Sequence, residues 1–292
     1  MRRVWQGKNC YRWQKDWILN YGNEDWMCTT PLNELSSISD WPASKPDLML
    51  SQLSVWYGSL GGIEIYKGDT AAGLANLAIA SLCDFVGISV FVNRTRAMNF
   101  AYPLYFLSTD ALKLARLISL GFFKEAKIIA EKLNGAIYRS EHADVPTQLA
   151  KFVLTLCFRS LEIPSPTVYL ARPDLDFYRT ILVHYLDEDP SACLSSALAE
   201  SCEYHIEQSR DNTNSGSYDI SDKSFQLYPA EILAVLRLRE QRGLSQPSID
   251  HSLMDMRTAK LHPIQLPATY PDFLVDIISK MKAAAPRFAD GL

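Results

Sequence analysis

Residues 74–92 read LANLAIASLCDFVGISVFV and form the most apolar stretch of the chain. The stretch is long enough to cross a lipid bilayer, but Asn76 and Asp84 interrupt it, which favours a buried helix over a membrane span. Apolar residues fall on every face of the predicted helix. A helix of that kind lies in the middle of a bundle, so we expect other helices to surround this one.

The residues before this stretch show a second helical pattern. Apolar residues from Met49 to Leu60 recur at spacings of four, three and four, which places them in one stripe along a helix. Ser44 begins a segment that resembles a capping box, and the Gly61-Gly62 pair marks the expected end of the helix. We therefore expect two consecutive helices joined by a glycine-containing turn.

Helical patterns separated by prolines and glycines continue to the end of the sequence. Helices are predicted from Pro103 to Gly121, over residues 123–133, from Asp144 to Pro164, and over residues 174–187, 190–209, 229–242 and 271–284. Strand candidates at residues 166–170 and 264–266 are too few to build a sheet. The sequence predicts an all-α fold, a single globular bundle of about eight to ten helices arranged as helical hairpins.

Two segments differ from this helical pattern. Residues 1–45 hold five of the six tryptophans, and we expect this segment to pack on the helical domain of residues 46–292. Residues 208–224 read QSRDNTNSGSYDISDKS and contain almost no aliphatic side chains. This composition predicts an exposed polar loop between two helices.

Length and composition exclude several classes of protein. The chain has 292 residues, 48% of them hydrophobic, and its 13 glycines and 15 prolines are too few for a collagen-like or disordered chain. A chain of this length buries a large core without disulfide bonds. The six cysteines contain no CxxC pair and the first residues contain no secretory signal, so we expect reduced cysteines and a cytoplasmic location.

The common catalytic and metal-binding motifs are absent from the sequence. It contains no GxGxxG, GxxxxGK[ST], HExxH or GxSxG. Cys193 and Cys202 are nine residues apart and face opposite ways on one helix. The histidines have no metal-ligand spacing and are interpreted as structural: His142, His184, His205, His251 and His262. We therefore expect no enzymatic activity, no cofactor and no metal.

Charge is distributed unevenly along the chain. Residues 173–222 hold eleven acids and two bases, whereas residues 1–15 hold five bases and no acid. This acidic stretch is interpreted either as a solvated surface or as a docking surface for a basic partner, and paired carboxylates in acid–base catalysis are a weaker alternative. Glu200, Glu203 and Glu207 share one helix face. The candidate docking residues are Asp187, Glu188, Asp189, Glu200, Glu203, Glu207 and Asp211.

Three short stretches resemble a known family. They are GDTAAGLANLAIAS at residues 68–81, YPAEILAVLRLREQRG at 228–243 and HPI at 262–264. Together they resemble the immunity proteins of bacterial polymorphic toxin systems, in particular the all-helical family called immunity protein forty-nine. The resemblance implies a non-enzymatic protein that binds a cognate toxin delivered by neighbouring cells and blocks it.

The family supplies no fixed binding residues, so the acidic stretch is our own candidate for the toxin-binding surface. Many such toxins act on nucleic acids or nucleotides and carry basic active-site clefts. An acidic surface would attract such a toxin during the encounter and then occlude its cleft. We expect no nucleic-acid partner, because the sequence pI is about 5.8, and no membrane partner. The apolar helices are compatible with a homodimer.

A tetratricopeptide-like scaffold that binds a peptide or protein is the alternative. The stretches KGDTAAGLANLA and LGFFKEAKIIAEKL each begin at a glycine-containing turn and place alanine at a close-packing position. However, no period of about 34 residues recurs, as such an array requires. An enzyme of unfamiliar type is the third hypothesis, and a deep pocket lined by acids and a histidine would support it.

Overall fold

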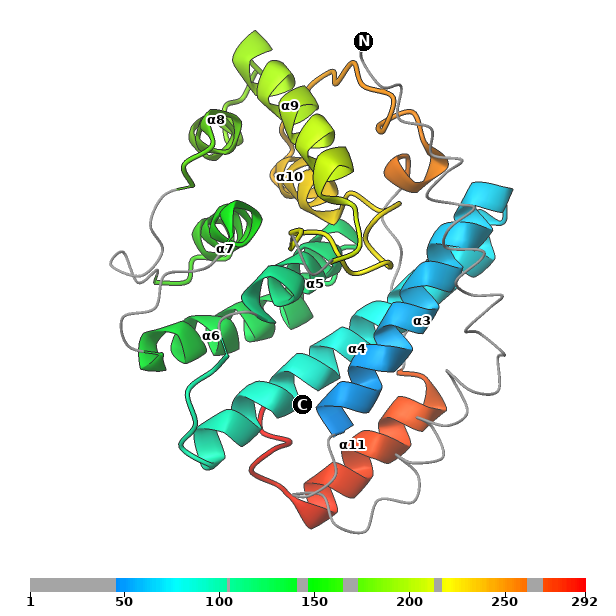
Figure 1. Cartoon of the computed structure of the whole chain (residues 1–292), viewed down its shortest axis with the longest axis vertical. Coiled ribbons are helices and arrows are strands. Elements are labelled where there is room, and N and C mark those ends of the chain that lie inside the picture. Colours follow the sequence, from blue (N-terminus) through cyan, green and yellow to red (C-terminus); the bar gives the residue numbers. More distant parts are fainter. Residues whose placement is uncertain (1–45, 104–105, 141–146, 165–172, 213–216, 262–269) are drawn as a thin grey trace.

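The fold consists of helices throughout the part of the chain that the computed structural model describes, residues 46–103, 106–140, 147–164, 173–212, 217–261 and 270–292. These residues contain no strand, which confirms the predicted all-α class. The elements (Figure 1) are α3 (Pro46–Lys67), α4 (Thr70–Ala97), α5 (Leu107–Ser119), α6 (Phe123–Arg139), α7 (Gln148–Ser160), α8 (Asp176–His184), α9 (Ala192–Gln208), α10 (Ala230–Gln241), η3 (Arg257–Ala259) and α11 (Asp272–Ala284).

Most predicted helices lie within a few residues of the observed ones. For example, the helix predicted over residues 190–209 is α9, and the one predicted over 271–284 is α11. Several predictions fall outside the described residues: the packing of residues 1–45, the helix start at Asp144, and both strand candidates.

The predicted end of the first helix at Gly61-Gly62 is wrong, because α3 continues through both glycines to Lys67. A Cβ atom on Gly61 would lie 2.8 Å from the Gly73 carbonyl oxygen of α4. Gly61 therefore allows the backbones of α3 and α4 to approach closely, and the Gly61-Gly62 pair does not make a turn. The turn lies at Gly68, which has a φ of +110° that suits glycine.

Helix α4 is the core helix that the apolar stretch predicts. Within the described residues it is the one helix with the length and composition to cross a membrane, and 78% of its most apolar window is buried inside the fold. Asp69 caps its N-terminus, since the Asp69 carboxylate accepts a hydrogen bond from the Ala72 amide at 3.0 Å. The apolar character of α4 is thus accounted for by helix packing.

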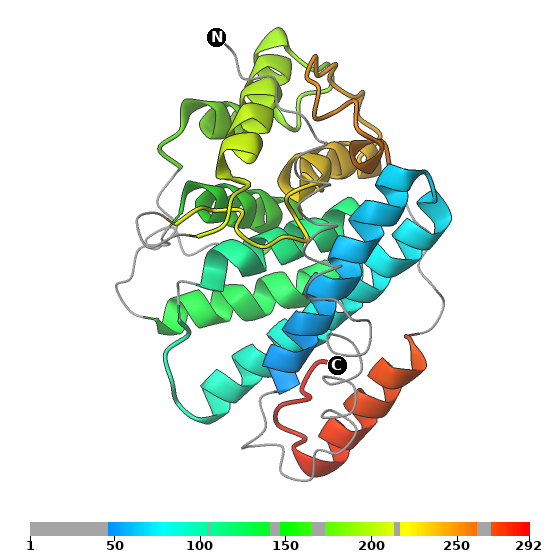
Figure 2. The ribbon, with the colours of Figure 1, turned by 45° about the vertical axis from the view of Figure 1, so that its right-hand side comes forward.

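Helix α5 lies at the centre of the molecule. Residues 110–120 are all buried, and α4, α6, α7 and α10 pack around this helix. Figures 1 and 2 show α5 between α10 on one side and the α3–α4 hairpin on the other. Because α10 follows α5 by more than 100 residues, the chain closes on itself as a compact bundle, in agreement with the predicted architecture.

The residues after α11 pack against α4 and α6. The Asn93 side-chain amide of α4 donates hydrogen bonds to the carbonyl oxygens of Phe288 and Asp290, both at 2.9 Å. Lys132 of α6 donates to the same Asp290 carbonyl at 2.8 Å. These bonds join α4 and α6 to a segment that is distant in sequence.

The predicted exposed loop, residues 208–224, is only partly exposed. Arg210 and Asp211 face solvent, but Ile220 and Ser224 are buried. The Asp219 carboxylate accepts a hydrogen bond from the Tyr204 hydroxyl at 2.8 Å. Polar side chains of this segment form hydrogen bonds with one another and with α9. The segment is therefore partly buried although its sequence is hydrophilic.

Candidate functional site

The acidic face consists of Glu200, Glu203 and Glu207, which are all exposed on α9. The opposite side of α9 is apolar and buried, with Leu194, Leu198 and Cys202 at spacings of four. The Ser191 side chain caps the start of this helix by accepting from the Leu194 amide at 3.2 Å. The predicted clustering of the three glutamates on one solvent-facing side is therefore confirmed.

A buried contact between a histidine and a glutamate joins α9 to α10. His205 Nδ1 lies 2.7 Å from Glu231 Oε1 of α10, and both side chains are fully buried. His184 and His251 also contact carboxylates: His184 Nδ1 lies 2.8 Å from an Asp187 oxygen, and His251 Nε2 lies 3.3 Å from Glu203 Oε1. The described histidines thus have the structural partners that we expected, while His142 and His262 lie outside the described residues.

Asp187, Glu188 and Asp189 lie in the segment directly before α9. Buried Arg239 of α10 holds the backbone of this segment, because its guanidinium donates to the carbonyl oxygens of Tyr185 and Asp187, both at 2.9 Å. Glu188 and Asp189 are exposed, and Asp187 is half-buried. An internal arginine therefore positions this acidic segment.

The last candidate acid, Asp211, follows the C-terminal end of α9. Its carboxylate lies 3.1 Å from Lys223 Nζ, so part of its charge is neutralised within the chain. The neighbouring Arg210 lies over the Tyr218 ring at 5.7 Å from its centroid. The structure therefore places candidate acids before, along and after α9, a helix about 25 Å long.

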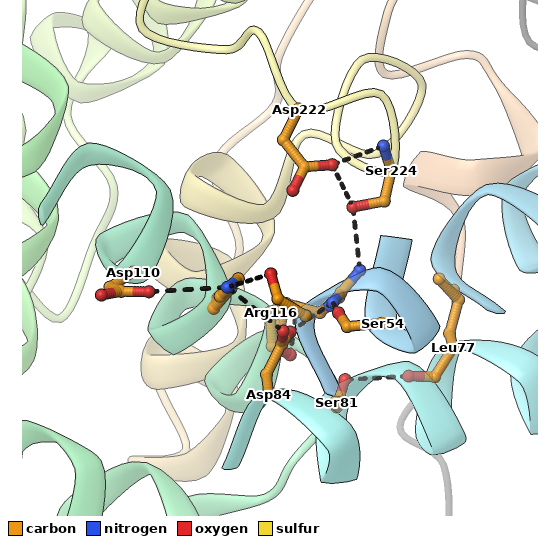
Figure 3. A network of polar contacts seen from close by, with 11 residues as sticks. Ser54, Leu77, Ser81, Asp84, Asp110, Arg116, Asp222 and Ser224 are labelled. Carbon is orange, nitrogen blue, oxygen red and sulfur yellow. Dashed lines mark hydrogen bonds and ion pairs between the residues drawn. The ribbon is translucent and has the colours of Figure 1, made fainter. Parts of the chain in front are cut away.

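A second polar cluster lies inside the bundle, and the sequence analysis did not predict it. Arg116 of α5 is fully buried and forms an ion pair with Asp84 of α4. Its guanidinium also donates to the hydroxyls of Ser54 at 2.7 Å and Ser224 at 3.3 Å, and it lies 4.5 Å from the centroid of the Phe225 ring. Figure 3 shows these groups converging from α3, α4, α5 and the segment before α10.

The same cluster continues along α5 through Lys113 and Asp110. The Lys113 ammonium lies 3.6 Å from Asp110 Oδ1 and 3.8 Å from Asp84 Oδ1, and it donates to the Ser51 hydroxyl at 3.3 Å. Tyr102 donates a hydrogen bond to Asp110 Oδ2. The spacing of three residues between Asp110, Lys113 and Arg116 places all of them on one side of α5.

Burial changes the acid–base properties of this cluster. Loss of solvent raises the pKa of Asp110, although Lys113 and Tyr102 act against that change. Burial also raises the pKa of Tyr102 well above its ordinary value. For Lys113, burial acts to lower the pKa, but Asp110 and Asp84 outweigh it and the pKa is raised. The cluster therefore keeps Lys113 charged and disfavours ionisation of Asp110.

This shift makes a prediction for Asp110→Asn. The folded state retains the Asp110 proton at pH values where the unfolded chain has lost it. The Asp110 carboxyl therefore lowers the free energy of unfolding once the pH rises above the ordinary pKa of 3.8. Asparagine lacks that proton but still accepts a hydrogen bond from Tyr102. The free energy of unfolding of the variant, relative to the unmodified protein, should therefore increase from about pH 4 to pH 7. Urea unfolding across this range measures it, and a constant difference would contradict the assignment.

Comparisons of the chain with protein-family models, with curated proteins and with solved structures find no match. The resemblance to the immunity proteins therefore stays a prediction. Within the described part of the chain, no group of three or more histidine, cysteine, aspartate or glutamate side chains is arranged to hold a metal ion.

Proposed function

We propose that this chain is an immunity protein that binds and neutralises a cognate antibacterial toxin by occluding its active site. The observation that carries the proposal is the acidic face, Glu200, Glu203 and Glu207, which α9 presents to solvent. The resemblance of residues 68–81 and 228–243 to an immunity protein family supports the class of partner.

The electrostatics of the acidic face suit this role. Residues 173–222 carry a net charge of 2 − 11 = −9, against −4 for the whole chain. Such a surface speeds association with a basic protein and disfavours partners of the wrong charge. A toxin with a basic cleft for a nucleic acid or nucleotide would present the complementary charge.

The scaffold behind the acidic face also suits binding. The buried His205–Glu231 pair fixes α9. Arg239 donates a hydrogen bond to the Asp187 carbonyl oxygen and so fixes the backbone of the acidic segment before α9. A surface that is already ordered loses little conformational entropy when a partner binds. The acidic face is thus built on rigid elements, as tight inhibition requires.

The packing of α5 counts against the tetratricopeptide-like alternative. In a repeat array each helical pair contacts only its neighbours in sequence. Here α10 packs directly on α5, although more than 100 residues separate the two helices. Contacts of this range are typical of a closed bundle, which lacks the long concave surface that peptide-binding arrays use.

The proposal is tested by reversing the acidic face. We expect the triple substitution Glu200→Lys, Glu203→Lys and Glu207→Lys to raise the dissociation constant for the toxin by at least about tenfold, because close charge pairs at an interface contribute about 1.5–7 kcal/mol. The toxin to use is the product of the gene next to this one, and binding is measured by calorimetry. Growth of cells that express both proteins measures protection.

A matched control reverses three exposed acids on α6 and α11: Glu131, Asp272 and Asp276. It changes the net charge by the same amount and should leave the affinity within about threefold, since scattered surface charges affect mainly the association rate. Both variants should keep helical circular dichroism spectra. If the neighbouring gene product does not harm cells, the result would argue against the immunity function. Equal losses of toxin affinity in both variants would instead show that the acidic face is not the binding surface.

A further inference from the structure

A pocket of about 100 Å³ opens between α3, α4 and α5, at the outer end of the polar cluster. Its polar lining consists mainly of the Asp84 and Asp110 carboxylates and the Lys113 ammonium. Phe91 and Phe106 form an apolar wall, with their rings edge to face and 5.5 Å apart. The pocket therefore combines charged groups with an aromatic wall.

The carboxylates of this pocket have more acceptor oxygens than the neighbouring donors use. Asp84 Oδ2 accepts from Arg116, but buried Asp84 Oδ1 accepts no hydrogen bond from the described residues. Asp110 Oδ2 accepts from Tyr102. The Oδ1 atoms of Asp84 and Asp110 both face Lys113 Nζ, at 3.8 and 3.6 Å, which is beyond hydrogen-bond length.

A buried carboxylate oxygen without a donor is costly, and a ligand that supplies N–H donors removes that cost. The remaining carboxylate of the lining, Asp47, does not need a ligand donor, because Arg94 holds it at 2.7 and 3.0 Å. The demand for donors is therefore greatest at Asp84 Oδ1. Figure 3 shows Asp110 at one end of the network and Asp84 near its centre, next to Arg116.

We propose that this pocket binds an alkylammonium group, a primary amine on a short aliphatic body. The ammonium supplies three N–H donors to Asp84, and its positive charge lowers the pKa of Asp110, which burial raises. Its aliphatic body packs against Phe91 and Phe106, whose rings also attract a cation. A carboxylate ligand has no donor for the buried Asp84 Oδ1, and an alcohol offers only one donor.

This site lies on α3, α4 and α5, away from the acidic face on α9, and does not depend on the proposed function. Two sources supply the same chemistry, a free aliphatic amine and the lysine side chain of another protein. The probes are n-butylamine for the free amine and Nα-acetyl-lysine amide for the side chain. n-Butanol and butyrate are matched neutral and anionic controls.

The full chain is titrated with each probe at pH 7, and NMR gives the dissociation constants. We expect n-butylamine to bind at least about tenfold more tightly than n-butanol or butyrate, since a hydrogen bond to a charged group is worth at least that factor. If Nα-acetyl-lysine amide also binds, a lysine side chain is the ligand. If only n-butylamine binds, the ligand is a free amine. Equal binding of n-butylamine and n-butanol, or no binding of either amine, would overturn the proposal.

Two variants change the affinity in opposite directions. Asp110→Asn removes one carboxylate and should weaken n-butylamine about tenfold, whereas Lys113→Met removes the competing ammonium and should strengthen it by a similar factor. Asp176→Asn is the matched control, because Asp176 pairs with Arg179 three residues away and does not line the pocket. A loss of n-butylamine affinity in Lys113→Met would contradict the assignment, as would a loss in Asp176→Asn equal to that in Asp110→Asn. If a variant does not fold, the comparison of the four probes on the unmodified protein decides.

Discussion

Replacement of Arg116 by methionine is expected to lower the free energy of unfolding by about 3–5 kcal/mol, the usual cost of removing one partner from a buried ion pair. The substitution removes the closest counterion of the buried Asp84 carboxylate and leaves Lys113 at 3.8 Å. The Ser54 and Ser224 hydroxyls also lose their donor. The guanidinium occupies space next to Gly58 that a side chain would fill, because a Cβ atom at this position would lie 2.5 Å from Arg116 Nη1. Urea unfolding followed by circular dichroism measures the change.

Two companion variants separate charge from packing. Arg179→Met breaks an ion pair with Asp176 whose side chains are 48% and 88% exposed, and it should cost under about 1 kcal/mol. Adding Asp84→Leu to Arg116→Met should recover much of the lost stability, because an apolar pair of similar volume replaces a buried ion pair at little cost. If Arg116→Met costs no more than Arg179→Met, the buried pair does not hold the bundle together.

The substitution Gly61→Ala in α3 is expected to destabilise the protein by about 2 kcal/mol, within the range for overpacking of a closely packed interior. The new Cβ atom would lie 2.8 Å from the Gly73 carbonyl oxygen and 3.1 Å from the Leu77 amide nitrogen. Both are backbone atoms of α4, so relief requires the two helices to separate. This loss exceeds the gain of about 1 kcal/mol that alanine normally brings to a helix interior.

The same change at Gly135 of α6 is the matched control. A Cβ atom at Gly135 has only the mobile end of Arg139 nearby, at 3.5 Å, so Gly135→Ala should stabilise the protein by up to about 1 kcal/mol. Thermal unfolding of the two variants should therefore shift in opposite directions. Stabilisation by both substitutions would show that α3 and α4 are not in close contact at Gly61.

The helices could be predicted from the sequence because each depends on local signals. The apolar residues 74–92 lie within α4, and Gly121, with its positive φ, lies where the sequence predicts the end of a helix. Gly61 and Gly62 misled the prediction because glycine has two uses, in turns and in close helix contacts. Only the facing residue Gly73, a neighbour in space, decides between them.

The acidic face could be predicted because the spacing of Glu200, Glu203 and Glu207 is a property of one helix. The buried cluster could not, because its central pair joins Arg116 of α5 to Asp84 of α4, and its other members come from two further segments. One signal was present in the sequence: Asp84 interrupts an apolar run, and a buried aspartate needs a cation. Nothing in the sequence identifies Arg116 as that cation.

The bonds from Asn93 to the Phe288 and Asp290 carbonyls also have a consequence for how the chain folds during its synthesis. The partners are 195 and 197 residues apart, which at about 5–20 residues per second corresponds to a delay of roughly 10–40 s on the ribosome. The α3–α4 hairpin joins neighbouring segments and can form long before then. Asn93 and Lys132 remain without these carbonyl partners throughout the delay, so the attachment of residues 288–290 is a late step that completes a bundle whose central helices have already met.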